Sequence, residues 1–242
     1  MATTRVDEAY NPKVKSICGL DIQSSFDLDV EKCGVGGRIW KAAIAFVDMI
    51  EKYDMTFKDK TVIEIGAGTG LSALAIGMKQ PQKVVITDVD LGCVETIKLN
   101  LEINKDKVDK ESIDVKELNF GDKEALQKII KEYPEGFDYL IGTDIVYGTY
   151  LIPLIITALD NLAFKEGCQI MIALSTIFPE VALFLDELKS TGRYLIREYD
   201  AGELDDMYYK VKVFFRLDLP VLGDIFTFPV TGQTKAIYYA KD

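Results

Sequence analysis

A regular alternation of strand-like and helix-like segments constrains the fold of this chain more than any other feature. From residue 61 onward, short apolar runs alternate with stretches whose apolar residues recur at helical spacing. The runs that we predict to be strands are 61–66, 83–88, 112–118, 137–144 and 168–174, and the predicted helices are 71–79, 91–103, 122–132, 151–161 and 181–190. Consecutive strands joined through helices pair in parallel, with helices on both faces of the sheet.

The two ends of the chain depart from this alternation. Near the C-terminus, residues 208–217 and 235–240 form two strand patterns with no helix between them, which predicts an antiparallel edge. We therefore expect an α/β fold whose seven-stranded sheet is mostly parallel. A helix is predicted over residues 39–53, whereas residues 1–22 look irregular and 24–32 alternate only weakly.

A chain of 242 residues with 48% apolar content can bury one substantial core. We predict a single domain over residues 39–242. An N-terminal extension or cap segment, residues 1–38, precedes it. Residues 218–234 are apolar in part and are open to two interpretations, a hairpin or a partner surface.

A glycine turn follows the first predicted parallel strand. Gly66, Gly68 and Gly70 alternate there after Glu64. Glycines permit a sharp turn and a close approach of backbone to a ligand. A dinucleotide fingerprint would need glycine at position 71, which is leucine, and the G-K-[ST] ending of a phosphate loop is absent. A carboxylate at Glu64 suits a ligand with a positively charged amino group, although a turn without any ligand remains the alternative.

An acidic residue ends the second strand. Asp88 lies 20 residues after Gly68, and a carboxylate at such a strand end can accept hydrogen bonds from ribose hydroxyls. A helix cap or a solvated loop acid is the alternative for Asp88 on its own. Asp90 is the better candidate for the cap of the following helix.

Charge and composition exclude several functions. The net charge of −11 disfavours duplex nucleic acid, which requires a basic surface, and is compatible with a basic protein partner. The chain has no histidine and no C-x-x-C pair, so we expect neither a metal site nor a histidine-dependent catalytic triad. The polar N-terminal segment and the interrupted apolar runs predict neither a secretory signal nor a membrane span, and hence a cytoplasmic protein, with the nucleus as an alternative.

Four stretches of the sequence resemble the class I (seven-strand) S-adenosylmethionine-dependent methyltransferases. More narrowly, they resemble the methyltransferase-like family 16 group of protein-lysine methyltransferases, in which the same stretches occur in the same order. They are Ile39 to Ala43, the sequence VIEIGAGTGL at 62–71, Glu117 to Gly121, and Asp144 to Tyr147, which carries an Asp-x-x-Tyr motif. The resemblance runs from about residue 24 to 188 and implies a Rossmann-like fold. It also implies S-adenosylmethionine as the cofactor and S-adenosylhomocysteine as the product.

The resemblance assigns cofactor contacts residue by residue. It places Gly66, Ala67 and Gly68 along the methionine part, Asp88 at the ribose, Phe120 by the adenine, Thr143 against the adenine or sulfonium side, and Trp40 over the methionyl end. Three positions depart from the family. Phe120 replaces the usual tryptophan, Thr143 the usual alanine, and Lys41 the usual acid after the tryptophan. The last change affects the charge where substrate enters.

The catalytic hypothesis rests on Asp144 and Tyr147. We expect Asp144 to receive and orient an incoming lysine ammonium and Tyr147 to shape the aromatic side of its channel; an N-cap and ordinary packing are the structural alternatives. The resemblance implies a folded protein substrate, such as a chaperone or a translation elongation factor. We expect the enzyme to be a monomer. A small-molecule N-methyltransferase and a non-catalytic binding module on the same fold are the competing hypotheses.

Overall fold

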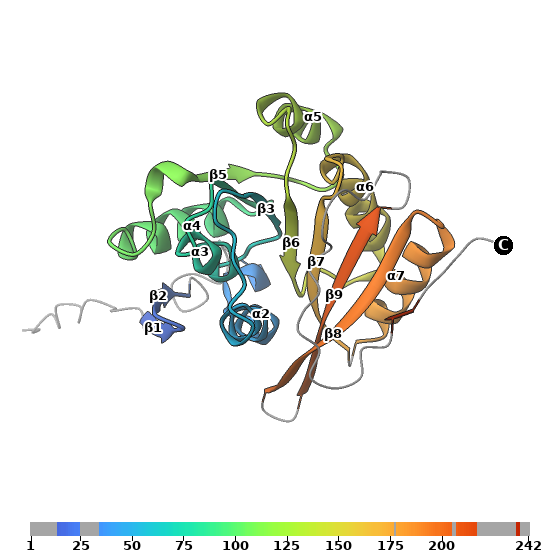
Figure 1. The fold of residues 1–242 in the computed structure, drawn as a ribbon, viewed down its shortest axis with the longest axis horizontal. Coiled ribbons are helices and arrows are strands. Elements are labelled where there is room, and N and C mark those ends of the chain that lie inside the picture. Colours follow the sequence, from blue (N-terminus) through green and yellow to red (C-terminus); the bar gives the residue numbers. More distant parts are fainter. Residues whose placement is uncertain (1–13, 25–33, 177, 205–206, 217–235, 238–242) are drawn as a thin grey trace, which may run out of the picture.

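The computed structural model describes residues 14–24, 34–176, 178–204, 207–216 and 236–237. Within these ranges a twisted sheet forms the centre of the molecule, and helices lie on both of its sides (Figure 1). The strands of the chain are β1 Val14–Ile17, β2 Leu20–Gln23, β3 Thr61–Ile65, β4 Lys83–Asp88, β5 Ile113–Glu117, β6 Tyr139–Thr143, β7 Gln169–Ser175, β8 Tyr194–Leu204, β9 Met207–Arg216 and β10 Ala236–Ile237. The α-helices are α2 Lys41–Lys52, α3 Leu71–Gly77, α4 Leu91–Ile103, α5 Lys123–Glu132, α6 Ile152–Leu162 and α7 Pro179–Ser190.

The order of strands in the central sheet is β10-β8-β9-β7-β6-β3-β4-β5. The five strands from β3 to β7 pair in parallel, and β8, β9 and β10 form the antiparallel part. The fold class is as predicted. Within the described residues this sheet has eight strands, one more than the predicted seven, because the sequence analysis missed β8. Its apolar pattern is diluted by charged residues and interrupted by a bulge between Asp200 and Gly202.

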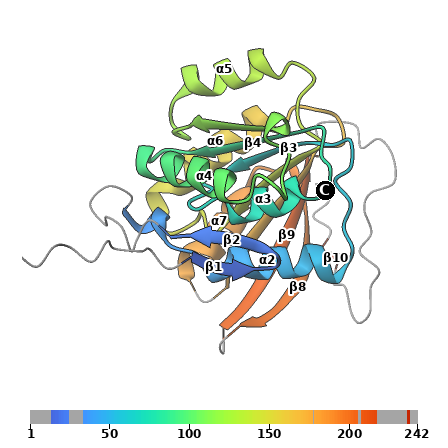
Figure 2. The same cartoon turned by 90° about the vertical axis from the view of Figure 1, so that its left-hand side faces the viewer.

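Two apolar layers cover the two faces of the sheet. On one face α2, α3 and α4 pack against side chains such as Val62, Val84 and Ile86. On the other, α5, α6 and α7 pack against Ile63 and Val85. Successive side chains along β3 and β4 point to opposite faces of the sheet, so each strand contributes to both layers. Figure 2 shows the first of these layers from the front. None of the helices in the described ranges is long and apolar enough to cross a membrane.

The region predicted to be irregular contains a β-hairpin. The strands β1 and β2 pair antiparallel through Cys18 and Gly19, whose φ angles are both positive, 47° and 82°. Strand β2 packs beside α4 (Figure 2), where Asn100 accepts a hydrogen bond from the backbone N–H of Gln23 (2.8 Å) and donates to its carbonyl oxygen (3.0 Å). Asn104 makes the same pair of bonds one turn later, with Asp21. The two asparagines satisfy backbone groups of an edge strand.

The other sequence predictions for the N-terminal region have mixed outcomes. The predicted strand over 24–32 falls almost wholly outside the described residues, as do residues 218–234 and most of 235–240. The boundary after residue 38 stays a prediction. Leu20 and Ile22 of the hairpin are nevertheless fully buried in the same apolar layer as α2 and α3.

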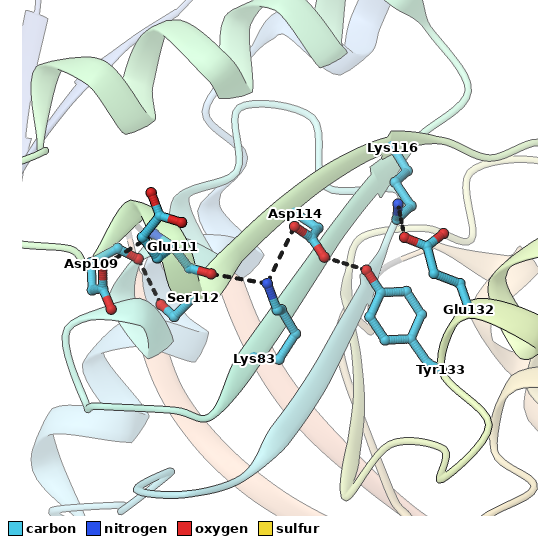
Figure 3. Close-up of polar contacts among 8 residues, drawn as sticks. All are labelled: Lys83, Asp109, Glu111, Ser112, Asp114, Lys116, Glu132 and Tyr133. Carbon is cyan, nitrogen blue, oxygen red and sulfur yellow. Dashed lines mark hydrogen bonds and ion pairs between the residues drawn. The ribbon is translucent and has the colours of Figure 1, made fainter.

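The strand β5 forms the free edge of the parallel part of the sheet, and its side chains carry charge. Lys83 forms an ion pair with Asp114 (3.3 Å), which also accepts a hydrogen bond from the hydroxyl of Tyr133 (Figure 3). Lys116 pairs with Glu132 of α5 at 2.8 Å. Charges of both signs along an edge discourage pairing with another strand. We attribute to this cluster a structural role only.

The topology sets the position of the functional site. The chain moves from β3 outward through β4 to β5, and then returns to the other side of β3 with β6 and β7. At such a point of reversal the segments after neighbouring strands diverge and leave a crevice at the carboxyl edge of the sheet. The segments that follow β3, β4, β5, β6 and β7 all reach this edge.

Candidate active site

The glycine turn after β3 adopts a backbone that other residues avoid. Gly66, Gly68 and Gly70 have φ angles of 64°, 57° and 78°, all in the left-handed region. A Cβ atom on Gly68 would lie 2.6 Å from the carbonyl oxygen of Gly36, and one on Gly66 would lie 2.9 Å from Cγ2 of Ile145. Because these positions carry no side chain, a ligand can approach the backbone of the turn closely.

Glu64 lies behind this turn and does not line the cavity beside it. Its side chain is fully buried; one carboxyl oxygen accepts a hydrogen bond from the backbone N–H of Ala73 (3.1 Å), and the other has no partner. Burial raises the pKa of Glu64 to about 8. From the sequence, Glu64 is expected to pair directly with a ligand amino group. A fully buried side chain that does not line the cavity does not fit that role. The contact shows that Glu64 ties the end of β3 to the first turn of α3.

Asp88, at the end of β4, holds the glycine turn from the other side. Its carboxylate accepts hydrogen bonds from the backbone N–H groups of Gly68 (2.8 Å) and Asp90 (3.0 Å), and burial raises its pKa. Each carboxylate oxygen has two lone pairs, so both oxygens keep capacity for a further donor on the cavity side. Asp90 caps α4 by accepting from the N–H of Gly92 (2.8 Å), as predicted.

A cavity of about 730 Å³ opens beside the turn. Its lining includes nine of the ten site residues predicted from the sequence, all except Glu64; they are Trp40, Gly66, Ala67, Gly68, Asp88, Phe120, Thr143, Asp144 and Tyr147. The segment before α2 forms one wall. There the indole N–H of Trp40 donates to the carbonyl oxygen of Val35 (3.0 Å), which closes a short loop against the glycine turn.

Asp144 follows β6 in a strained conformation. Its φ of 49° is in the left-handed region, which is uncommon for a residue with a side chain. Its own N–H donates to the carbonyl oxygen of Ala173 (2.9 Å), and its carboxylate accepts from the N–H of Ser175 (3.0 Å). Burial raises the pKa of Asp144 to about 6, although the N–H groups of Ser175 and Ala42 stabilise the charged form. Ala42 belongs to the first turn of α2, so this negative charge also stabilises the N-terminal end of that helix.

The remaining predicted residues surround this carboxylate and the glycine turn. Thr143 is buried at the end of β6, and Phe120 packs beside Gly66, 3.4 Å from the position of a Cβ there. Tyr147 is more than half exposed at the mouth. Its pKa is raised by burial and, in smaller measure, by Tyr150 and the charge of Asp88.

Sequence reasoning missed several residues of the cavity. Two of them, Ile145 and Val146, are buried, and others that line the cavity are partly or largely exposed; the latter are Val35, Arg38, Val89, Tyr150, Phe178 and Glu180. Position after a parallel strand is the signal that could have found Val89, Ile145 and Val146. Phe178 and Glu180 follow β7 in the same way, but no motif distinguishes them from other residues at the start of a helix.

The turn and its surroundings fit S-adenosylmethionine in three respects. A Cβ at Gly66 or Gly68 would clash with neighbouring atoms, the Asp88 carboxylate keeps free lone pairs for hydroxyl donors, and Phe120 offers a ring to a base. A Rossmann-like sheet with this glycine turn, this acid after the second parallel strand and an antiparallel C-terminal edge is the arrangement of the S-adenosylmethionine-dependent methyltransferases.

The comparisons specify the family within this class. The sequence profile described as lysine methyltransferase matches residues 21–191, so the chain belongs to the lysine methyltransferase family. It is 28% identical to the protein N-lysine methyltransferase METTL21A of Danio rerio over 76% of this chain and 81% of that protein. It is 30% identical to EEF1A lysine methyltransferase 3 of Mus musculus, over 62% of this chain and 60% of that protein. The chain thus spans less than two thirds of the mouse relative.

Solved structures agree on the fold. The TYW2 protein of P. horikoshii, solved in complex with MeSAdo, superimposes with a TM-score of 0.52 at 16% identity, covering 85% of this chain and 71% of that one. An identity this low supports the shared architecture alone.

Proposed function

We propose that this enzyme methylates a lysine side chain of a folded protein, and that a translation elongation factor of the EEF1A type is the first substrate to test. The name of the mouse relative supports this choice, and the net charge of −11 suits a basic partner. A chaperone is the other folded substrate that we consider. The names of the relatives do not favour a small-molecule acceptor.

The observation that carries the proposal is the Asp144 carboxylate at the cavity. It is half-buried, strained and close to the glycine turn, and at neutral pH it is charged because its pKa of about 6 lies below 7. A partly desolvated carboxylate binds an ammonium group through a charge-assisted hydrogen bond. Tyr147, three residues later, lies at the mouth of the same cavity and flanks the approach.

When bound, S-adenosylmethionine supplies an electrophilic methyl group on a sulfonium sulfur. The residues of this chain bind and align. Gly66, Gly68 and Asp88 would hold the cofactor, and Asp144 would hold the lysine. Asp144 orients the amine and does not remove its proton, since a nearby carboxylate raises the pKa of an amine. The lysine loses its proton to solvent, at a cost of about 4 kcal/mol near pH 7.4 for a pKa of about 10.4.

Two substitutions test the function. Asp144→Ala should abolish methylation of purified elongation factor 1A, or of proteins in a cell lysate, while S-adenosylhomocysteine still binds. Binding can be followed by the fluorescence of Trp40, the single tryptophan of the chain, which lines the cavity. The exposed residue Lys98 on α4 provides a matched control as Lys98→Ala. Full activity of Asp144→Ala, or transfer of label from wild type only to low-mass compounds, would contradict the proposal.

We also propose that the enzyme acts as a cytoplasmic monomer without a nucleic-acid or membrane partner. The acidic net charge supports the first of these exclusions. Sedimentation of the purified protein tests the oligomeric state, and fractionation of cells tests the localisation.

A further inference from the structure

Exposed apolar side chains concentrate around the mouth of the cavity. Among the residues whose side-chain exposure the structure describes (14–24, 34–176 and 178–197), ten large hydrophobic residues are exposed and six of them line this cavity; the six are Val35, Trp40, Val89, Tyr147, Tyr150 and Phe178. They come from four separate segments, so no single amphipathic helix accounts for them. We call these six residues the apolar rim.

Two aromatic members of the rim have no role in the mechanism described so far. Tyr150 is 68% exposed and Phe178 is 45% exposed. Exposed aromatic residues are costly in a free surface, and interfaces concentrate them as anchors of binding energy. Trp40 and Tyr147 carry expected roles toward cofactor and lysine, whereas Tyr150 and Phe178 do not.

The local structure constrains the Tyr150 ring and the Phe178 backbone. A Cβ atom on Gly148 would lie 2.6 Å from Cε1 and 3.0 Å from Cδ1 of Tyr150, so the ring lies directly against the backbone of Gly148. Phe178 is the N-cap residue of α7, and its carbonyl oxygen accepts from the N–H of Val181 (3.1 Å). Side chains that are ordered before binding lose less entropy on binding.

Charge at the rim is mixed. Arg38, Asp90 and Glu180 line the cavity along with the buried acids. In all, four acidic side chains and one basic side chain line the cavity. The net charge of the whole chain can speed the encounter with a basic protein, but it does not define the contact.

We infer that the apolar rim docks the protein substrate through apolar side chains that flank the target lysine. The occupant is thus a folded surface on which a lysine lies among exposed hydrophobic residues, and its affinity comes from apolar burial at Tyr150 and Phe178. This inference rests on the proposed function, because the six residues line the same cavity as Asp144, which we propose binds the lysine.

The test measures transfer of tritiated methyl from S-adenosylmethionine to the proteins of a lysate that lacks the enzyme. Tyr150→Ser and Phe178→Ser should each raise the apparent KM for the labelled protein about tenfold, as expected for interface anchors. Their kcat and their affinity for S-adenosylhomocysteine should stay within about twofold of wild type. Gly148→Ala keeps every apolar atom but displaces the Tyr150 ring, so it should also raise KM.

Matched controls lie away from the cavity. Val14 and Leu99 are 47% and 40% exposed and do not line it, so Val14→Ser and Leu99→Ser should leave KM unchanged.

The outcomes distinguish failure of the rim inference from failure of the proposed function. If wild type labels protein and the rim variants label it with unchanged KM, the rim inference is overturned and the proposed function stands. If wild type labels no protein, the proposed function falls and the rim inference with it. A wild-type dimer that dissociates in Tyr150→Ser would assign the rim to a second copy of this chain and overturn the inference.

Discussion

Replacing Asp144 with asparagine should abolish methyl transfer and at the same time stabilise the fold. The carboxylate is partly buried, and this burial raises its pKa from an ordinary 3.8 to about 6. Asparagine keeps the shape and a carbonyl oxygen for the N–H of Ser175, but it carries no charge. The variant therefore loses the partner of the ammonium together with the cost of a buried charge.

The magnitude follows from the two pKa values. A difference of about two between the folded and unfolded states corresponds to at most about 3 kcal/mol, at 1.36 kcal/mol for each unit. Because the folded-state pKa is the higher one, the penalty is complete above pH 6, declines as the pH falls, and vanishes below the unfolded value of 3.8. Wild type should approach the stability of Asp144→Asn on acidification.

Urea unfolding at pH 7.5 and pH 5 provides the assay. Asp144→Asn should unfold at higher urea than wild type at pH 7.5, and at pH 5 its advantage should shrink to roughly half. Asp106→Asn, which removes an exposed carboxylate, should change the stability by less than about 0.5 kcal/mol. A variant less stable than wild type at pH 7.5 would refute the reasoning, since Asp144 would then act mainly as a cap for α2.

Three further substitutions test the surroundings of the site. Gly68→Ala should weaken binding of S-adenosylhomocysteine at least tenfold in calorimetry, because its Cβ would meet the Gly36 carbonyl oxygen at 2.6 Å; unchanged affinity would contradict the turn geometry. Asn100→Ala should lower the stability by about 3 kcal/mol in urea unfolding, since buried hydrogen bonds to β2 and to the carbonyl oxygen of Thr69 are lost. In wild type, burial gives Glu64 a pKa of about 8, so stability should fall as the pH rises from about 5 to 8. Glu64→Gln should flatten that fall, and an unchanged pH profile would count against it.

The sequence predicted the structure best where a conformation strongly favours one residue type. The glycines at 66, 68 and 70 all adopt the left-handed conformation that their pattern predicts. The period of apolar residues similarly predicted every parallel strand, because buried strands and amphipathic helices differ in spacing.

Other features could not be predicted because they depend on contacts distant in sequence. The turn of the β1–β2 hairpin uses cysteine at a positive φ, where asparagine, aspartate or glycine is the usual signal, and the hairpin owes its place to asparagines about 80 residues later. Glu64 gave no sign that it would lie behind the turn. The rim assembles Tyr150 and Phe178 from segments that only the topology brings together.

The central claim is that the cavity beside the glycine turn binds the sulfonium cofactor. Calorimetric titration of the purified protein with S-adenosylmethionine and with S-adenosylhomocysteine, at two temperatures, tests it most directly. We expect one saturable site for each compound, with binding of both compounds weakened by Gly68→Ala. Absence of heat with both compounds at both temperatures would contradict the account.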